Sequence, residues 1–279
     1  MAFRDVLLGL TSYPEPTPVS VVENAVSFAS SLGCHIAALA CEVHIQVPGS
    51  FLSSSLVNVA GMAASEANKS RKGAEALLAA FDSIADKAGL SHERILEKCL
   101  THEVPDMFVE YGRLRDLMIV PVPEAYDQWY AETVIFGTGK PTLVLPEGPR
   151  AKPFKLNTAV VAWDFSRAAA RAIADAIPVL EKVKEVRIVT VANEKVLDTK
   201  HSGEELAKNL SRHGIDVILE NVDAGGRSIG EVLETHAASC SADLLVMGAY
   251  GHSRWREFIL GGATQSMLSK PPVPILFSH

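Results

Sequence analysis

A repeated pattern constrains this chain more than any other feature: short apolar runs alternate with helical segments on both sides of a proline-rich break. The break covers residues 146–153 (PEGPRAKP), where three prolines and one glycine exclude both a helix and a continuous strand ladder. It lies near the midpoint of the 279-residue chain, which is long enough for two ordinary domains. The break therefore predicts two domains, residues 1–148 and residues 153–279.

The second half contains apolar runs of strand length, separated by segments with helical periodicity. Ser166 is a suitable N-cap for the first of these helices, and Gly214 is a suitable residue to end the second. Strictly alternating strands and helices predict a parallel sheet with helices on both faces. The expected strands are 157–163, 186–191, 215–222, 244–247 and 273–277, and the expected helices are 168–183, 204–213, 228–239 and 263–268.

The first half follows the same order, and three of its segments align with segments of the second half. The two halves are therefore interpreted as a tandem repeat, and we expect two doubly wound, five-stranded parallel-sheet α/β domains. The pattern assigns no helix to the stretch between the last two strands of this half. The expected strands are 5–10, 35–44, 95–101, 117–122 and 141–145, and the expected helices are 19–32, 60–88 and 104–111.

Composition and charge exclude several classes of protein. The formal net charge is −7 and no basic stripe is present, so we expect no binding to nucleic acid through phosphate neutralisation. The four cysteines, at positions 34, 41, 99 and 240, form no CxxC pair, which argues against a zinc site. The chain has no run of about 18 apolar residues, and its first residues lack the pattern of a signal peptide. We therefore expect a cytoplasmic protein that has no membrane partner.

Glycines after the fourth expected strand of the second half suggest a phosphate site. Gly248 and Gly251 come directly after that strand, and Gly261 and Gly262 come directly before a short helix. Exposed N–H groups at a helix N-terminus bind phosphate, and Thr264 adds a hydroxyl donor. Ordinary turn chemistry is the alternative, because strand-to-helix connections often use glycine. The pattern matches neither GxGxxG nor GxxxxGK(S/T), which excludes the dinucleotide fingerprint and the P-loop.

The spacing Gly-x2-Gly-x9-Gly, formed by Gly248, Gly251 and Gly261, resembles the nucleotide-binding signature of the universal stress protein family. Both halves are similar in their order of strands and helices to tandem-domain members of that family. The resemblance implies an adenine nucleotide alpha hydrolase-like fold that holds ATP, or AMP or ADP, at the strand ends, with Mg²⁺ left open. The family usually has Ser or Thr directly after the third glycine. This chain has Gly262 there, and Thr264 is the candidate substitute.

Carried over by position, the resemblance implies a role for each residue of the site. Asp164 would hold the adenosine part, and the backbone of Val191 would contact the adenine. Met247 and Gly248 would line the ribose side. The N–H groups expected to contact the phosphates belong to Gly251, Gly261, Gly262 and Ala263.

The first half departs from this pattern, and we interpret it as a degenerate unit that binds no nucleotide. Thr11 stands where the second half has an acid, and Pro121 and Glu124 stand where it has its first two glycines. Proline has no N–H to donate, and a glutamate would repel a phosphate. Only residues 137–139 (GTG) are similar to the third glycine, and they run directly into Lys-Pro.

These residues favour binding over turnover. No base that could orient an attacking water is visible, and no paired carboxylates are placed for Mg²⁺. No catalytic residue is therefore assigned, and we expect slow ATP hydrolysis at most. The leading hypothesis is a nucleotide-binding module in stress response or signalling. A weak ATPase or phosphotransfer enzyme that uses Asp164 and Thr264 is one alternative, and an interaction protein with a vestigial pocket is another.

Two apolar segments, 141–145 and 273–277, are expected at the edges of the two sheets. An unpaired apolar edge strand favours aggregation unless another strand or segment covers it. In single-domain members of the family, the equivalent strand pairs two subunits about a two-fold axis. A tandem chain can make that contact internally, so we predict a pseudo-two-fold pair of halves. A further homodimer of whole chains stays open.

Overall fold

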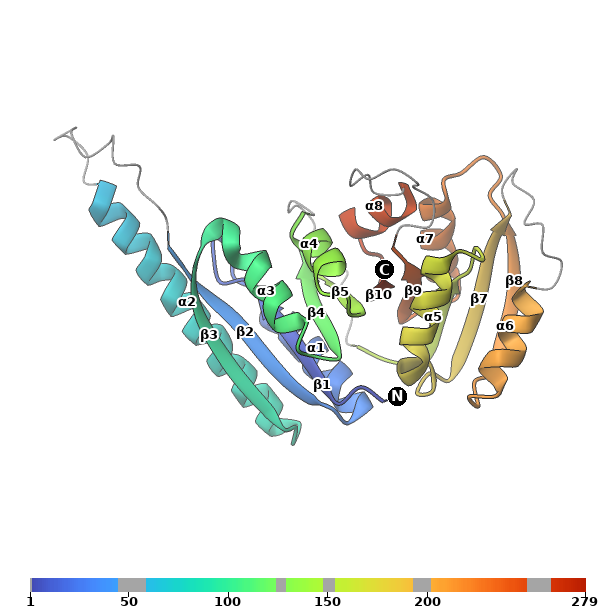
Figure 1. Ribbon diagram of the computed structural model, residues 1–279, viewed down its shortest axis with the longest axis horizontal. Helices are drawn as coiled ribbons and strands as arrows, with labels where there is room; N and C mark the ends of the chain where they lie inside the picture. Colours follow the sequence, from blue (N-terminus) through green and yellow to red (C-terminus); the bar gives the residue numbers. More distant parts are fainter. Residues whose placement is uncertain (1, 45–58, 124–128, 148–153, 193–201, 250–261) are drawn as a thin grey trace.

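The computed structural model describes residues 2–44, 59–123, 129–147, 154–192, 202–249 and 262–279. Strands and helices alternate along the chain, and the strands form one sheet (Figure 1). The strands are β1 (Asp5–Leu10), β2 (His35–His44), β3 (His92–Leu100), β4 (Leu117–Val122), β5 (Thr142–Pro146), β6 (Thr158–Ala162), β7 (Glu185–Ala192), β8 (Val217–Asp223), β9 (Leu244–Gly248) and β10 (Ile275–Ser278). The helices are α1 (Val19–Leu32), α2 (Val59–Lys87), α3 (Val104–Gly112), α4 (Trp129–Gly137), α5 (Arg167–Leu180), α6 (Ser202–Ser211), α7 (Ile229–Ser239) and α8 (Gly262–Ser269), with a 3₁₀ turn, η2 (Thr101–Glu103), before α3.

The strand order is β3-β2-β1-β4-β5-β10-β9-β6-β7-β8. Read outward from the central β5–β10 pair, the two halves have the same strand order. All pairs within each half are parallel. One buried cluster lies beneath α1, α2, α5 and α6, and another lies beneath α3, α4, α7 and α8. This arrangement confirms the expected fold class of two tandem, doubly wound, five-stranded units.

The halves meet where β5 pairs with β10, and this pair is antiparallel. Leu143 lies opposite Leu276, and both side chains are fully buried. The contact extends beyond the strands, because the backbone N–H of Phe154 donates to Asn24 Oδ1 at 3.0 Å. The Phe154 ring also packs edge-on against Phe28, with the ring centroids 5.3 Å apart. The start of the second half is therefore fixed to α1 of the first half as well as to its last strand.

A shared hydrogen-bond pattern supports the internal repeat. In the first half, Asp116 Oδ2 accepts from the backbone N–H groups of Arg4 at 2.8 Å and Asp5 at 3.1 Å. In the second half, Asp243 Oδ2 accepts in the same way from the two residues where β6 begins, Asn157 and Thr158, at 2.8 and 3.3 Å. Each aspartate precedes the fourth strand of its half and ties it to the start of the first strand.

Local signals place several helix ends correctly. Ser166 Oγ accepts from the Ala169 N–H at 3.1 Å, as expected for the N-cap of α5. Gly33 and Gly214 follow α1 and α6 with φ of 64° and 75°, in the left-handed region that favours glycine. These caps act over a few residues, so the sequence is sufficient to identify them.

The stretch before β5, for which the sequence pattern gives no helix bounds, contains α4, so the first half has the same order of strands and helices as the second. Gly137 lies at the end of this helix, where an added Cβ would meet the Val109 side chain at 2.7 Å. Residues 137–139 therefore do not correspond to the glycine that opens α8. Gly137 lets α4 approach α3, and Gly139, with φ of 63°, makes the turn into β5. Close helix packing explains this glycine, and a phosphate loop does not.

Candidate functional site

The candidate site lies where β6 and β9 end side by side. In the sheet order, β6 is flanked by β7 and β9, so the chain direction of the connections reverses between β6 and β9. Val161 pairs with Val246, which places the residues two positions further, Trp163 and Gly248, at the same level of the sheet. In open α/β sheets, ligands bind outside the carboxyl ends of the strands at such a reversal.

Gly248 has a packing role that does not depend on a ligand. A Cβ at this position would lie 2.4 Å from the Ala168 carbonyl carbon and 2.6 Å from the Ala169 nitrogen. Only glycine therefore lets the end of β9 approach the first turn of α5. This close approach fixes the N-terminus of α5 beside the end of β9.

Asp164 directly follows Trp163 beyond the end of β6, and its side chain is exposed at the strand edge. Its Oδ1 accepts from the Ser166 N–H at 2.9 Å, which orients the carboxylate before α5 begins. Phe165 lies between these two residues with φ of 60° and is 52% exposed. The structure thus brings the carboxylate and Gly248 to the same strand edge, as the sequence predicts.

Val191 and Met247 lie near the ends of β7 and β9. Val191 is half-buried and pairs with Val222. Met247 pairs with Phe277, and its side chain is in the core with 5% exposure. A ligand at the strand edge would therefore meet the Met247 backbone and not its thioether.

The start of α8 supplies the remaining described residues of the candidate site. Gly262 is exposed, and a Cβ there would meet nothing within 4 Å. Ala263 is half-buried, and Thr264 is buried with 3% exposure. At Gly230 of α7, an added Cβ would lie 2.6 Å from Ser266 Oγ, so close packing against α7 holds α8 in place.

Two residues expected in the site, Gly251 and Gly261, lie outside the described residues. The structure therefore describes only the two ends of the predicted glycine loop. These ends are Gly248, after β9, and Gly262, at the start of α8.

In the first half, α2 covers the corresponding strand edge. Ser12, which follows β1, donates to the Cys41 carbonyl at 2.7 Å, and Ser70 of α2 accepts from the Val43 N–H at 2.9 Å. A Cβ at Gly73 of α2 would lie 2.9 Å from the Ser12 carbonyl oxygen. Both serines are buried. In the first half, the ends of β1 and β2, the counterparts of β6 and β7, are therefore covered by α2.

Sequence reasoning missed this closure, although a signal was present. The helix expected at 60–88 is far longer than its counterpart at 204–213. The extra length includes Ser70 and Gly73, whose small size permits contact with the strand ends. Thr11 lies at the same edge. Its Oγ1 is 3.0 Å from Thr17 Oγ1, and this hydrogen bond closes the loop after β1.

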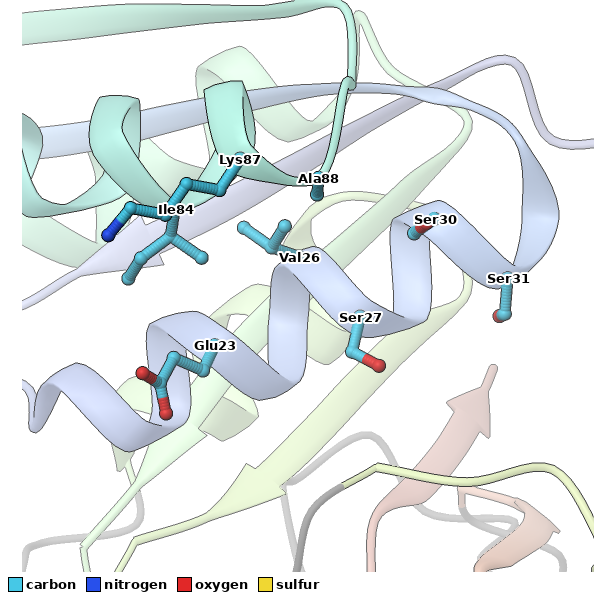
Figure 2. Close-up of a pocket in the computed structure, with 8 residues that line it drawn as sticks. All are labelled: Glu23, Val26, Ser27, Ser30, Ser31, Ile84, Lys87 and Ala88. Carbon is cyan, nitrogen blue, oxygen red and sulfur yellow. The ribbon is translucent and has the colours of Figure 1, made fainter.

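A groove of about 530 Å³ lies between α1 and α2 (Figure 2). It lies beside the C-terminal ends of both helices, which in β-α-β units adjoin the amino ends of the strands. It is therefore on the opposite edge from the one where such folds bind ligands. Its lining residues are Glu23, Val26, Ser27, Ser30, Ser31, Ile84, Lys87 and Ala88.

The described parts of the chain contain neither a metal-ligand cluster nor a membrane-spanning helix. Across these ranges, no group of three or more His, Cys, Asp and Glu side chains could hold a metal ion. Among the helices that the structure describes, none is long and apolar enough to cross a membrane.

Comparisons with known proteins agree with this fold. Residues 155–279 match the model of the universal stress protein family. A universal stress protein from Archaeoglobus fulgidus DSM 4304 has a similar structure, with a TM-score of 0.70 and 16% identity over 98% of this chain and 97% of that chain. A candidate universal stress protein from Pseudomonas aeruginosa UCBPP-PA14 follows, with a TM-score of 0.61 and 13% identity over 99% and 93%. At these identities the two structures show the fold alone. No curated protein matches the chain.

Proposed function

We propose that this chain, which belongs to the universal stress protein family through residues 155–279, is a stress-response protein that binds ATP or a related adenine nucleotide in its second half. The observation that carries the proposal is the arrangement of described residues at the carboxyl ends of β6 and β9. There an oriented carboxylate, Asp164, lies beside Gly248, at the point where the strand order reverses.

The charges of the site suggest how a nucleotide would lie. The exposed start of α8 at Gly262 offers N–H groups and the positive end of a helix dipole, both of which favour phosphate. Asp164 would repel phosphates, whereas its carboxylate can accept hydrogen bonds from ribose hydroxyl groups. The nucleoside would therefore lie along the ends of β6 and β7, with the phosphates toward α8.

The proposal assigns one nucleotide to each chain. In residues 1–148, Ser70 and Gly73 of α2 cover the ends of β1 and β2, where the nucleoside would lie in the second half, and Pro121 lacks the N–H that Gly248 retains. Residues 153–279 would then form the nucleotide-binding domain. The first domain would contribute the seam with β10 and no second pocket.

The proposed activity is binding with slow hydrolysis at most. The described residues offer no carboxylate cluster for Mg²⁺, so a metal would reach the site through the nucleotide phosphates. A weak ATPase that uses Asp164 and Thr264 is less well supported, because the Thr264 side chain is buried.

A pair of substitutions at Gly262 tests the proposal by calorimetric titration with ATP. Because a Cβ is accommodated there, neither Gly262→Ala nor Gly262→Asp should disturb packing. An acid at a helix start also favours the helix, so Gly262→Asp should keep the fold. We expect one equivalent of ATP per wild-type chain, retained binding in Gly262→Ala, and at least about tenfold weaker binding in Gly262→Asp through charge repulsion with phosphate.

Three outcomes would count against the proposal. Two equivalents of ATP per chain would refute the single site. Equal affinity of the Ala and Asp variants would show that α8 does not face the phosphates. A wild-type protein that binds no adenine nucleotide would favour the interaction protein with a vestigial pocket.

A further inference from the structure

Phe165 has an unusual combination of backbone strain and exposure. Its φ of 60° places a bulky residue in the left-handed region, and its side chain is 52% exposed. Non-glycine residues rarely adopt this conformation, and aromatic residues are especially disfavoured. The hydrogen bonds of Ser166, to Asp164 Oδ1 at 2.9 Å and from Ala169 at 3.1 Å, hold the turn in place.

Trp163 supports the Phe165 ring from the core side. The two rings meet edge to face, with centroids 5.8 Å apart and an interplanar angle of 86°. Trp163 is 7% exposed, and its backbone N–H donates to the Val189 carbonyl at 2.9 Å, which fixes it between the ends of β6 and β7. The exposed phenyl ring is therefore held at a defined angle at this strand edge.

The indole of Trp163 also has an unsatisfied donor. Its Nε1 is buried and has no hydrogen-bond partner among the described residues. Buried tryptophan N–H groups usually find an acceptor, because an unpaired buried donor is destabilising. The unpaired donor and the exposed ring belong to the residues on either side of Asp164, and no contact among the described residues satisfies the donor.

We propose that Phe165 forms an aromatic wall of the nucleotide site and contacts the base, with Trp163 as the positioning residue that sets its angle. This inference rests on the proposed adenine nucleotide site, and it adds a residue that the glycine spacing does not identify. Bases stack on aromatic side chains because every base has a π-face. The wall directly follows Asp164, the residue proposed to accept hydrogen bonds from the ribose.

Phe165→Gly separates a binding role from a folding role. Glycine adopts positive φ without strain, so this variant should unfold at the same temperature as the wild type or a higher one. If Phe165 contacts the base, ATP should bind roughly ten- to a hundredfold more weakly. Inorganic tripolyphosphate, which has no base, should bind the variant and the wild type equally.

A double-mutant cycle tests the role of Trp163. Trp163→Leu should weaken ATP binding when Phe165 is present and have little further effect in the Phe165→Gly background. Additive losses would contradict a positioning role. The contact between Phe165 and the base would be refuted if Phe165→Gly kept its ATP affinity, or if it lost tripolyphosphate binding equally. Neither result would contradict the proposed nucleotide site. A wild-type protein that binds no adenine nucleotide would refute the proposed function and, with it, the role of Phe165.

Discussion

Replacing Glu147 by glutamine should stabilise the protein above neutral pH. Glu147 directly follows β5, and its backbone N–H donates to the Val122 carbonyl at 2.9 Å. Its Oε1 is buried and has no hydrogen-bond partner in the part of the chain that the structure describes. Burial, with a smaller contribution from the nearby Glu15, raises the pKa of Glu147 from 4.5 to about 7. The folded protein therefore holds this carboxyl in an environment that disfavours its charge.

The size of the effect follows from the rise of the pKa. A rise from 4.5 to about 7 corresponds to roughly 3 kcal/mol at about 1.4 kcal/mol per pH unit. The folded state binds the proton more tightly than the unfolded state, so the free energy of unfolding decreases as the pH rises. The loss begins near pH 4.5 and is complete above pH 7. Glutamine stays neutral and similar in shape, so Glu147→Gln should remove this loss.

Urea denaturation between pH 4.5 and 8.5 measures the difference in unfolding free energy between Glu147→Gln and the wild type. We expect a difference near zero at the acid end, growing to about 2–3 kcal/mol at pH 8. Glu15→Gln, the matched control, should give a smaller gain over the same range, because Glu15 is the lesser cause of the shift. A difference that is independent of pH would show that the stabilisation is not electrostatic. No difference at any pH would show that the Glu147 carboxylate is hydrated in the folded protein.

Four substitutions test how the chain is held together. Leu143→Lys or Leu276→Lys should lower the melting temperature sharply, because each places an unpaired charge in the buried contact between β5 and β10. An unchanged melting temperature, measured by circular dichroism, would contradict the pairing of these two strands. Phe154→Ala should reduce the unfolding free energy by about 3 kcal/mol through loss of packing on Phe28, which denaturant titration would measure. Gly248→Val should destabilise the fold whether or not nucleotide is present, since its side chain would overlap the start of α5; a stable variant impaired only in ATP binding would refute that close contact.

The features that could be predicted from the sequence depend mainly on neighbouring residues. Strands β1, β2 and β4 have the expected bounds, because each is a continuous apolar run between turn residues. The cap at Ser166 and the left-handed glycines after α1 and α6 are equally local. The repeat supplied the topology, since a parallel sheet with right-handed crossovers allows few arrangements of a β-α unit.

The features that were missed depend on contacts between distant segments. Nothing near Gly137 shows that its missing side chain accommodates Val109 of α3, so it was assigned to a loop and α4 was overlooked. The contacts of Ser70 and Gly73 with the strand ends are equally invisible without the fold. In the candidate site, glycine spacing identifies Gly248, and position after a strand together with the family resemblance indicates Asp164, whereas neither singles out Phe165.

The asymmetry between the halves follows from where the seam lies. Both halves contribute their fifth strand to it, and its buried residues, Leu143 and Leu276, are alike. The strand ends around Thr11 and Asp164 take no part in this contact, so the fold constrains them less. One copy can therefore cover its strand ends with a long α2 while the other presents an oriented carboxylate there. A duplicated unit of this kind retains the interface in both copies, and its strand ends are free to diverge.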